Sequence, residues 1–139
     1  MQDFNKKIVI AVREDLPSWQ VLNTVAHISA YLGNRIREGF DTGEFFLTKD
    51  EQKLPRNSQY AIVVLSAKAS QLPAFIQEIR DSALPHLGFI REMIETTNDT
   101  EIEQLLGQKD EKDLEYLGVG TFGDIEQTKT LTKKFSLWK

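Results

Sequence analysis

Two short apolar segments constrain the fold of this chain more than any other feature. Residues 8–12 read Ile-Val-Ile-Ala-Val and residues 61–65 read Ala-Ile-Val-Val-Leu, so both are rich in β-branched side chains and neither alternates with polar residues. Such continuous apolar runs are typical of strands that are covered on both faces. A helical pattern follows each run, and this order predicts an α/β domain built in layers.

The two helical patterns have recognisable ends. Ser18 can cap the first helix, and Gly33 is its predicted end. Ser70 can cap the second helix, with Pro73 in the first turn, where proline is tolerated. Pro85 then prevents the second helix from continuing.

The remaining elements are shorter. Loop signals between the two units include Gly39 and Gly43, and residues 44–48 read as a short edge strand. Asn98 and Glu101 have the spacing of a capping box, which predicts a short helix. The other predicted elements are strands at residues 87–94, 114–121 and 135–138, and a short helix after Asp124.

The composition narrows the class of protein. The 139 residues predict a single domain over residues 1–139, which is long enough to bury a core. The chain has no cysteine, which excludes disulfides, thiolate metal sites and thiol nucleophiles. No apolar stretch approaches the ~20 residues of a membrane helix, and the polar N-terminus lacks a signal-peptide pattern. We therefore expect a cytoplasmic protein with no membrane partner.

The charge is distributed unevenly. The formal net charge is −4, which argues against a nucleic-acid partner because such proteins carry excess Lys and Arg to meet phosphates. Residues 99–115 hold seven acidic residues and two lysines, so this one segment carries −5. We interpret the basic tail as a solvated face rather than a phosphate track; its members are Lys129, Lys133, Lys134 and Lys139.

Three glycines match a dinucleotide-binding pattern by spacing alone. Gly118, Gly120 and Gly123 have this spacing, but the chain ends too soon after them to supply the rest of the unit. We therefore interpret them as positions of close backbone packing. Because only His27 and His86 are available and there are no thiols, the sequence predicts no metal site and no cofactor.

Polar residues gather where the first strand meets the first helix. Arg13 and Asp15 close the strand, at the end where ligands of α/β sheets tend to bind. Asn23 and His27 are four residues apart and hence share one helix face. These groups around one crevice can bind an ester or amide and move a proton. Alternatively, Arg13 and Asp15 form a surface pair and His27 is a hydrogen-bonded residue at the core boundary.

Two other side chains are weaker candidates. Thr121 can offer a hydroxyl at the end of its strand, although threonine in a strand needs no function to explain it. Trp19, near the start of the first helix, either covers a pocket or simply packs, and packing is the simpler interpretation.

Both ends of the chain carry further recognisable segments. Residues 7–16 read Lys-Ile-Val-Ile-Ala-Val-Arg-Glu-Asp-Leu and residues 23–27 read Asn-Thr-Val-Ala-His. Residues 117–123 read Leu-Gly-Val-Gly-Thr-Phe-Gly and residues 132–138 read Thr-Lys-Lys-Phe-Ser-Leu-Trp. Together they resemble the peptidyl-tRNA hydrolase type II superfamily, and above all its branch of small prokaryotic proteins of unknown function. The resemblance implies a three-layer α/β fold around a mixed, four- or five-stranded sheet, and often a dimer.

The chain departs from the hydrolases at their site residues. Gln20 stands where their last site lysine lies, and Thr24 aligns with their helix glutamine. Their Asp-Ala-Gly-Arg-Thr loop is replaced by the acidic segment 98–113, and Glu92 is the nearest acidic residue. The resemblance therefore implies a hydrolase-like crevice without efficient hydrolysis of peptidyl-tRNA.

Three functions follow as hypotheses. The first is a hydrolase of another ester or amide, in which Asp15 or His27 accepts a proton from water. The second is a non-catalytic module that binds a small molecule or a peptide end. The third is a homodimeric interaction protein with apolar surface at Phe45, Phe46 and Trp138. The candidate catalytic residues are Asp15, Asn23, His27 and Thr121, and the candidate ligand-binding residues are Arg13, Trp19, Gln20 and Thr24.

Overall fold

The computed structural model describes residues 3–37 and 44–139, so the predicted loop glycines Gly39 and Gly43 lie outside the described residues. A five-stranded mixed sheet has the order β5-β6-β1-β4-β7. The strands are β1 (Lys6–Arg13), β4 (Ala61–Ala67), β5 (His86–Ile90), β6 (Tyr116–Asp124) and β7 (Ser136–Leu137). The α/β class predicted from the two apolar runs is confirmed, and so is a mixed sheet.

β1 is the middle strand of the sheet and is covered on both faces. It pairs parallel with β4 and antiparallel with β6. Residues 8–12 are at most 1% exposed. Ile8, Ile10 and Val12 face one core cluster and Ala11 faces the other, as the period of two in a strand requires. The continuous apolar run is thus explained by two buried faces.

β4 is less well covered than its sequence predicts. Ile62, near its start, is 41% exposed. The beginning of β4 lies beyond the end of β7, which pairs only with Leu65 and Ser66. The prediction of a strand covered on both faces is therefore right for β1 and wrong for the first half of β4.

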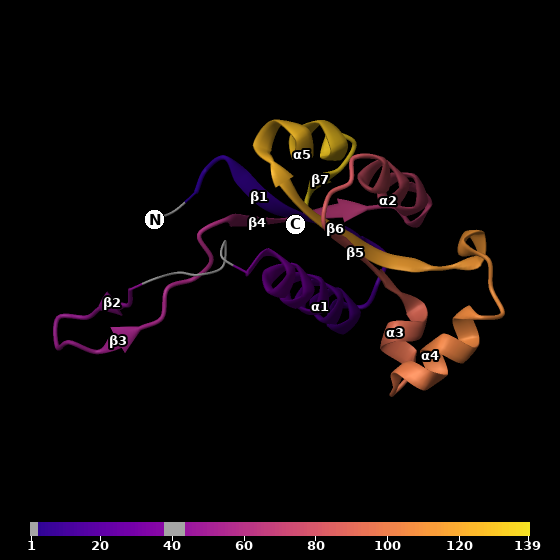
Figure 1. The fold of residues 1–139 in the computed structure, drawn as a ribbon, viewed down its shortest axis with the longest axis horizontal. Helices are drawn as coiled ribbons and strands as arrows, with labels where there is room; N and C mark the ends of the chain where they lie inside the picture. Colours follow the sequence, from indigo (N-terminus) through magenta and orange to yellow (C-terminus); the bar gives the residue numbers. More distant parts are fainter. Residues whose placement is uncertain (1–2, 38–43) are drawn as a thin grey trace.

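Helices cover the two faces of the sheet and give three layers (Figure 1). α1 (Ser18–Ile36) packs on one face against β1, β5 and β6. α2 (Leu72–Asp81) and α5 (Ile125–Thr132) pack on the other face, against β6 and against each other. The core therefore consists of two apolar layers, one on each side of β1.

The helix ends differ from the predictions by a few residues. Pro17, not Ser18, is the residue that precedes α1, and no side chain caps this helix. α1 continues through Gly33 to Ile36, because Ile36 still packs against the core. Ser70 lies inside a short 3₁₀ helix (Ala69–Gln71) that leads into α2, whereas Pro73 occupies the first turn of α2 as predicted.

Two short helices follow β5 at one end of the molecule. The predicted strand at residues 87–94 is shorter than expected, because β5 ends at Ile90 and α3 (Arg91–Glu95) begins there. α4 (Asp99–Leu106) has its predicted cap, since the Asn98 side chain accepts a hydrogen bond of 2.9 Å from the Glu101 backbone N–H. The charged segment that follows contains a 3₁₀ helix (Glu111–Asp113).

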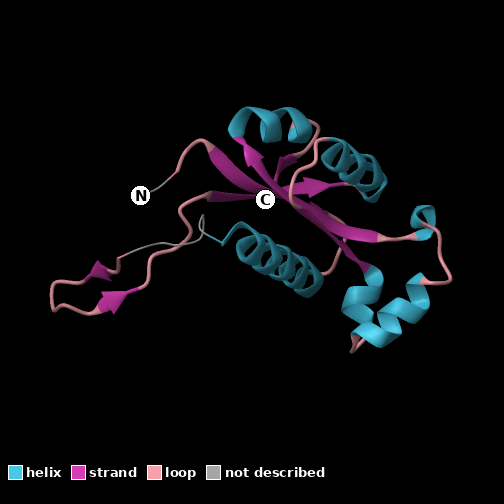
Figure 2. Ribbon diagram, in the orientation of Figure 1, coloured by secondary structure: helices cyan, strands magenta, loops and turns pink. Residues whose placement is uncertain are grey.

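A separate hairpin extends from the body at the end opposite to α4 (Figure 2). Its strands are β2 (Phe46–Leu47) and β3 (Lys53–Leu54), which pair only with each other. The predicted edge strand therefore exists but does not belong to the main sheet. Phe45 and Phe46 are about half exposed, whereas Trp138 is half-buried against the α1 layer.

Two glycines of β6 allow α1 to lie directly on the sheet. A Cβ atom at Gly118 would lie 2.6 Å from Thr24 Cγ2 and 3.2 Å from the carbonyl oxygen of Ala11. A Cβ atom at Gly120 would overlap the side chain of Ile28. The interpretation of these two glycines as close packing positions is confirmed.

We expect the substitution Gly118→Ala to lower the free energy of unfolding by about 1–3 kcal/mol, the usual cost of overpacking a core. The added methyl group has to push Thr24 and α1 away from the sheet, because the backbone oxygen of Ala11 on its other side cannot move independently. Gly107→Ala is the matched control, because Gly107 has an ordinary right-handed conformation at an exposed helix end. Urea denaturation of the three proteins checks this. Equal stability of Gly118→Ala and the parent would contradict it.

Candidate functional site

A network of ion pairs closes the carboxyl end of β1. Arg13 Nε and Nη2 donate to the two carboxylate oxygens of Asp15, each at 2.9 Å. Arg13 Nη1 donates to Glu115, which lies just before β6, at 2.5 Å. The Arg13 side chain is only 13% exposed. This arginine therefore connects the end of β1 to the beginning of β6.

Arg91 extends the same network to α1 and α3. Its Nη2 donates to Glu115 Oε1 at 2.9 Å, and its Nη1 donates to the Gln20 side-chain oxygen at 2.9 Å. The backbone N–H of Arg91 also donates to the carbonyl oxygen of Glu115. Glu95, one turn later, lies 3.8 Å from Arg91 Nε. Three segments that are distant in sequence, residues 13–20, 91–95 and 115, thus meet at the carboxyl end of β1.

Mutual pairing changes the acidity of these groups. Hydrogen bonds from Arg91 and then from Arg13 lower the pKa of Glu115 to about 2. The hydrogen bond from Arg13 also lowers the pKa of Asp15. A carboxylate that is held ionised by arginine is a poor proton acceptor at neutral pH. We therefore interpret this network, named here the Arg13–Arg91 network, as a structural clamp.

A pocket lies beside α1, about two helical turns beyond Gln20 of the Arg13–Arg91 network. The cavity has a volume of about 560 Å³. Its walls come from α1, β5, α3 and α4; the lining residues are His27, Ala30, Tyr31, Leu87, Phe89, Met93, Asp99, Ile102 and Glu103. Most of these side chains are apolar or aromatic, which is typical of sites for small organic molecules.

His27 is the imidazole of this pocket. Its ring stacks on the ring of Phe89, with centroids 5.2 Å apart and an angle of 15° between the planes. The side chain is exposed, and its ring makes no hydrogen bond to any residue in the described ranges. The alternative interpretation, a hydrogen-bonded histidine at the core boundary, therefore does not describe His27.

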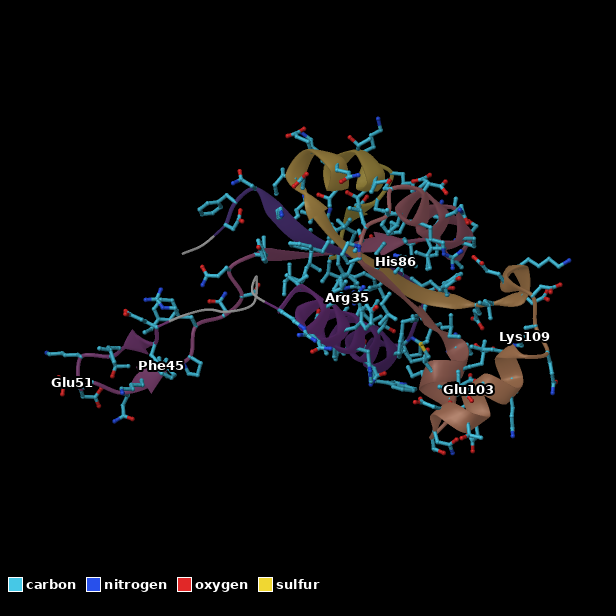
Figure 3. All side chains as sticks on the ribbon, in the orientation of Figure 1. Arg35, Phe45, Glu51, His86, Glu103 and Lys109 are labelled. Atoms are coloured by element: carbon cyan, nitrogen blue, oxygen red, sulfur yellow. The ribbon has the colours of Figure 1, made fainter. Side chains whose placement is uncertain are left out.

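α4 contributes the acidic rim of the pocket. Asp99 and Glu103 are one turn apart on α4, and Figure 3 labels Glu103 on this helix. Within residues 3–37 and 44–139, neither carboxylate has an ion-pair partner. No lysine or arginine is among the described residues that line the pocket. The pocket thus combines an apolar floor with two unpaired negative charges.

The loop after α4 is attached to α3 by an ion pair whose carboxylate is buried and whose lysine is partly exposed. Lys109 Nζ donates to Glu92, whose side chain is 7% exposed. Burial raises the pKa of Glu92, but the hydrogen bonds from Lys109 and from a backbone N–H lower it more, so the net shift is downward. This pair holds the acidic segment against the rest of the pocket wall.

The structure distributes the predicted site residues over several places. Arg13, Asp15 and Gln20 meet in the Arg13–Arg91 network. His27 follows Gln20 by seven residues, or about 10 Å along the helix axis, and lies in the pocket. Asn23 lies between them on α1 and is half-buried.

The other three predicted residues lie outside both places. Thr24 is fully buried under α1 against Gly118, and its hydroxyl has no hydrogen-bond partner in the part of the chain that is described. Thr121 is fully buried and donates to the Pro85 carbonyl oxygen at 2.7 Å. Trp19 is 59% exposed in the first turn of α1. The methyl group of Thr24 packs on Gly118, and the hydroxyl of Thr121 ties β6 to Pro85, so both threonines contribute to the core.

A smaller cavity lies at the carboxyl end of β4. It has a volume of about 280 Å³ and is lined by Glu14, Ser66, Ser136, Leu137, Trp138 and Lys139. This is the end of the parallel pair β1–β4, where α/β proteins commonly bind ligands. The cavity is about half the size of the His27 pocket and is the weaker candidate.

Sequence reasoning missed the residues that complete both places. Arg91 directly follows β5, and Glu115 directly precedes β6. Only the order of the strands in the sheet shows that both residues lie beside Arg13. Asp99 and Glu103 belong to the acidic segment, whose charge was visible but whose position over His27 was not. Their spacing of four residues on a capped helix is the one sequence signal that they share a face.

Within residues 3–37 and 44–139, no group of three or more histidine, aspartate and glutamate side chains could hold a metal ion. No helix in these residues is long and apolar enough to span a membrane.

Comparisons with known proteins agree on a fold without a known role. A family model for proteins of unknown function, DUF2000, matches residues 6–139. The structure of Atu0240, a protein of unknown function from Agrobacterium tumefaciens, superimposes with a TM-score of 0.85 and 23% identity over 99% of this chain and 100% of that chain. At this identity the likeness concerns the fold alone. No curated protein matches the chain.

We expect the Glu115→Gln variant to be less stable than the parent at pH 7, by up to about 1 kcal/mol because the carboxylate is partly exposed and screened. The pKa of Glu115 is lower in the folded state than its ordinary value of 4.5, so its contribution is fully present above that pH. The difference should shrink as the pH falls from about 4.5 to about 2.

Denaturant midpoints measured across this pH range test the expectation. Glu126→Gln, an exposed substitution on α5, is the control and should show no such convergence. A stability loss in Glu115→Gln that stays constant down to pH 2 would argue against the clamp.

Proposed function

The chain belongs to the DUF2000 family of proteins of unknown function, and we propose that it is a domain that binds a small organic molecule in the His27 pocket. The observation that carries the proposal is the shape and lining of this cavity. About 560 Å³ lies within the range of ~300–1,000 Å³ that is common for small-molecule sites. An apolar floor with a few polar groups at the rim is also typical of such sites.

The state of the polar groups favours binding over catalysis. Asp15 and Glu115 are held by arginines, so neither is free to activate water. Among the residues that the structure describes, no serine, threonine or lysine side chain lines the pocket next to His27. A histidine that serves as a base usually has a nucleophile or an orienting group within hydrogen-bond reach. His27 has instead a stacking partner, which suits contact with the flat part of a ligand.

A hydrolase is the second candidate, on a separate observation. The three layers and the mixed sheet agree with what the resemblance to the peptidyl-tRNA hydrolase type II superfamily implies, with a single domain as the unit. On this hypothesis His27 accepts the proton from water and the substrate is an ester or amide.

We expect ligands found in a broad fragment screen to bind the parent and to lose at least about tenfold in affinity in Ala30→Trp, because the indole fills the pocket from α1. Leu22→Trp is the matched control, since Leu22 is 70% exposed on the same helix and does not line the pocket. Thermal shift followed by titration calorimetry measures both effects, as a bound ligand raises the unfolding temperature. Ligands that bind Ala30→Trp as tightly as the parent would refute the assignment of the site.

We also expect ester and peptidyl-tRNA turnover to be the same for the parent and for His27→Ala, at the level of the uncatalysed reaction. Catalysis by a general base typically contributes about 10²–10⁴-fold, so a true hydrolase would lose activity of this size. A rate that is clearly above background and falls at least about a hundredfold in His27→Ala would favour the hydrolase instead.

A further inference from the structure

We propose that the His27 pocket selects an organic amine, that is, a ligand with an apolar body and a protonated nitrogen. This inference rests on the proposed function and specifies the chemistry of the same site. It starts from the asymmetry of the lining, in which all formal charge is negative and comes from one helix.

The two carboxylates are placed to meet a cation. Asp99 and Glu103 are separated by four residues, so they lie on the same face of α4, together with Ile102. Like charges at this spacing repel each other, which destabilises a helix slightly. In the described part of the chain no basic side chain relieves this repulsion. A positively charged group in the pocket would relieve it and would gain two ionic partners.

The opposite wall of the pocket suits the rest of such a ligand. Phe89 and Leu87 of β5 and Met93 of α3 form apolar surface below the rim. His27 and Tyr31 add two aromatic rings from α1 that suit flat apolar groups, and the face of the Tyr31 ring also attracts cations. A small molecule that spans the pocket therefore meets rings and methyl groups at one end and carboxylates at the other.

Other ligand classes fit this lining less well. An anionic ligand would face two carboxylates with no lysine or arginine to pair with it. A metal ion would need more donors, and the described residues hold no group of three candidate ligands. Arg91, two residues from both Phe89 and Met93, is paired with Glu115 and Gln20, and Arg35, in the last turn of α1, is not among the residues that line the pocket.

Three probes of nearly equal shape test the selection. They are 2-phenylethylamine, the neutral 2-phenylethanol and the anion 3-phenylpropanoate, titrated into the full chain at low salt with NMR or calorimetric detection. We expect the amine to bind about five- to tenfold more tightly than the alcohol, and the anion to bind most weakly. Raising the ionic strength should narrow the gap between amine and alcohol.

Charge-removing variants assign the effect to the rim. In Asp99→Asn/Glu103→Gln we expect the affinity for the amine to fall to that for the alcohol, while the affinity for the alcohol stays unchanged. Glu51→Gln/Glu126→Gln removes the same amount of charge from the hairpin and from α5, away from the pocket, and should keep the preference. Circular dichroism confirms that each variant is folded before titration.

The outcomes separate this inference from the proposed function. If all three probes bind equally and Ala30→Trp abolishes their binding, the pocket is a ligand site but the selection of amines is wrong. If the anion binds most tightly, or if the rim variant keeps the preference for the amine, the inference is likewise overturned. If no probe binds at millimolar concentration, the inference fails, and the fragment screen decides separately whether the pocket binds any ligand.

Discussion

The direct contact between α1 and β6 determines where the other parts of the candidate site can lie. Gly118 and Gly120 leave the surface of β6 flat, so Thr24 and Ile28 of α1 rest on it without intervening side chains. Because α1 lies this close to the sheet, only one side of the helix faces β5. This side of α1 carries Gln20, which accepts a hydrogen bond from Arg91, and His27, which stacks on Phe89. The clamp and the pocket both depend on this single packing distance.

The charged side chains of the Arg13–Arg91 network are paired with one another, whereas those of the pocket are not. Arg13 and Arg91 join carboxylates from three segments and hold the start of β6 against the ends of β1 and β5. Their charges are neutralised within the network, which leaves few arginine donors for a ligand. The charges of the pocket are not neutralised in this way, because Asp99 and Glu103 have no basic partner in the described residues. Satisfied charges here support the fold, and unsatisfied charges mark the candidate site.

Local patterns in the sequence predict much of the fold and little of the site. The apolar run of β1, the cap at Asn98 and the close packing of the β6 glycines follow from chemistry within a few residues, and the structure agrees with each. The separate hairpin was not foreseen, because a short apolar segment does not reveal its pairing partner. The site depends on contacts between distant segments, such as that of Arg13 with Glu115, which are separated by 102 positions. Residue type indicated that His27 and the acidic segment were unusual, but only the strand order brings them to the same pocket.

The outer wall of the pocket has a consequence for how a ligand enters. α4 has no fully buried residue and contacts the body through α3, through Leu106 at the margin of the core and through the Glu92–Lys109 pair that follows the helix, whereas α1 and β5 are anchored in the core. Elements with so little buried surface detach at a fraction of the free energy of global unfolding. Amide hydrogens of α4 should therefore exchange with solvent earlier than those of α1. A molecule bound in this pocket would thus lie between one wall that opens readily and another that is fixed in the core.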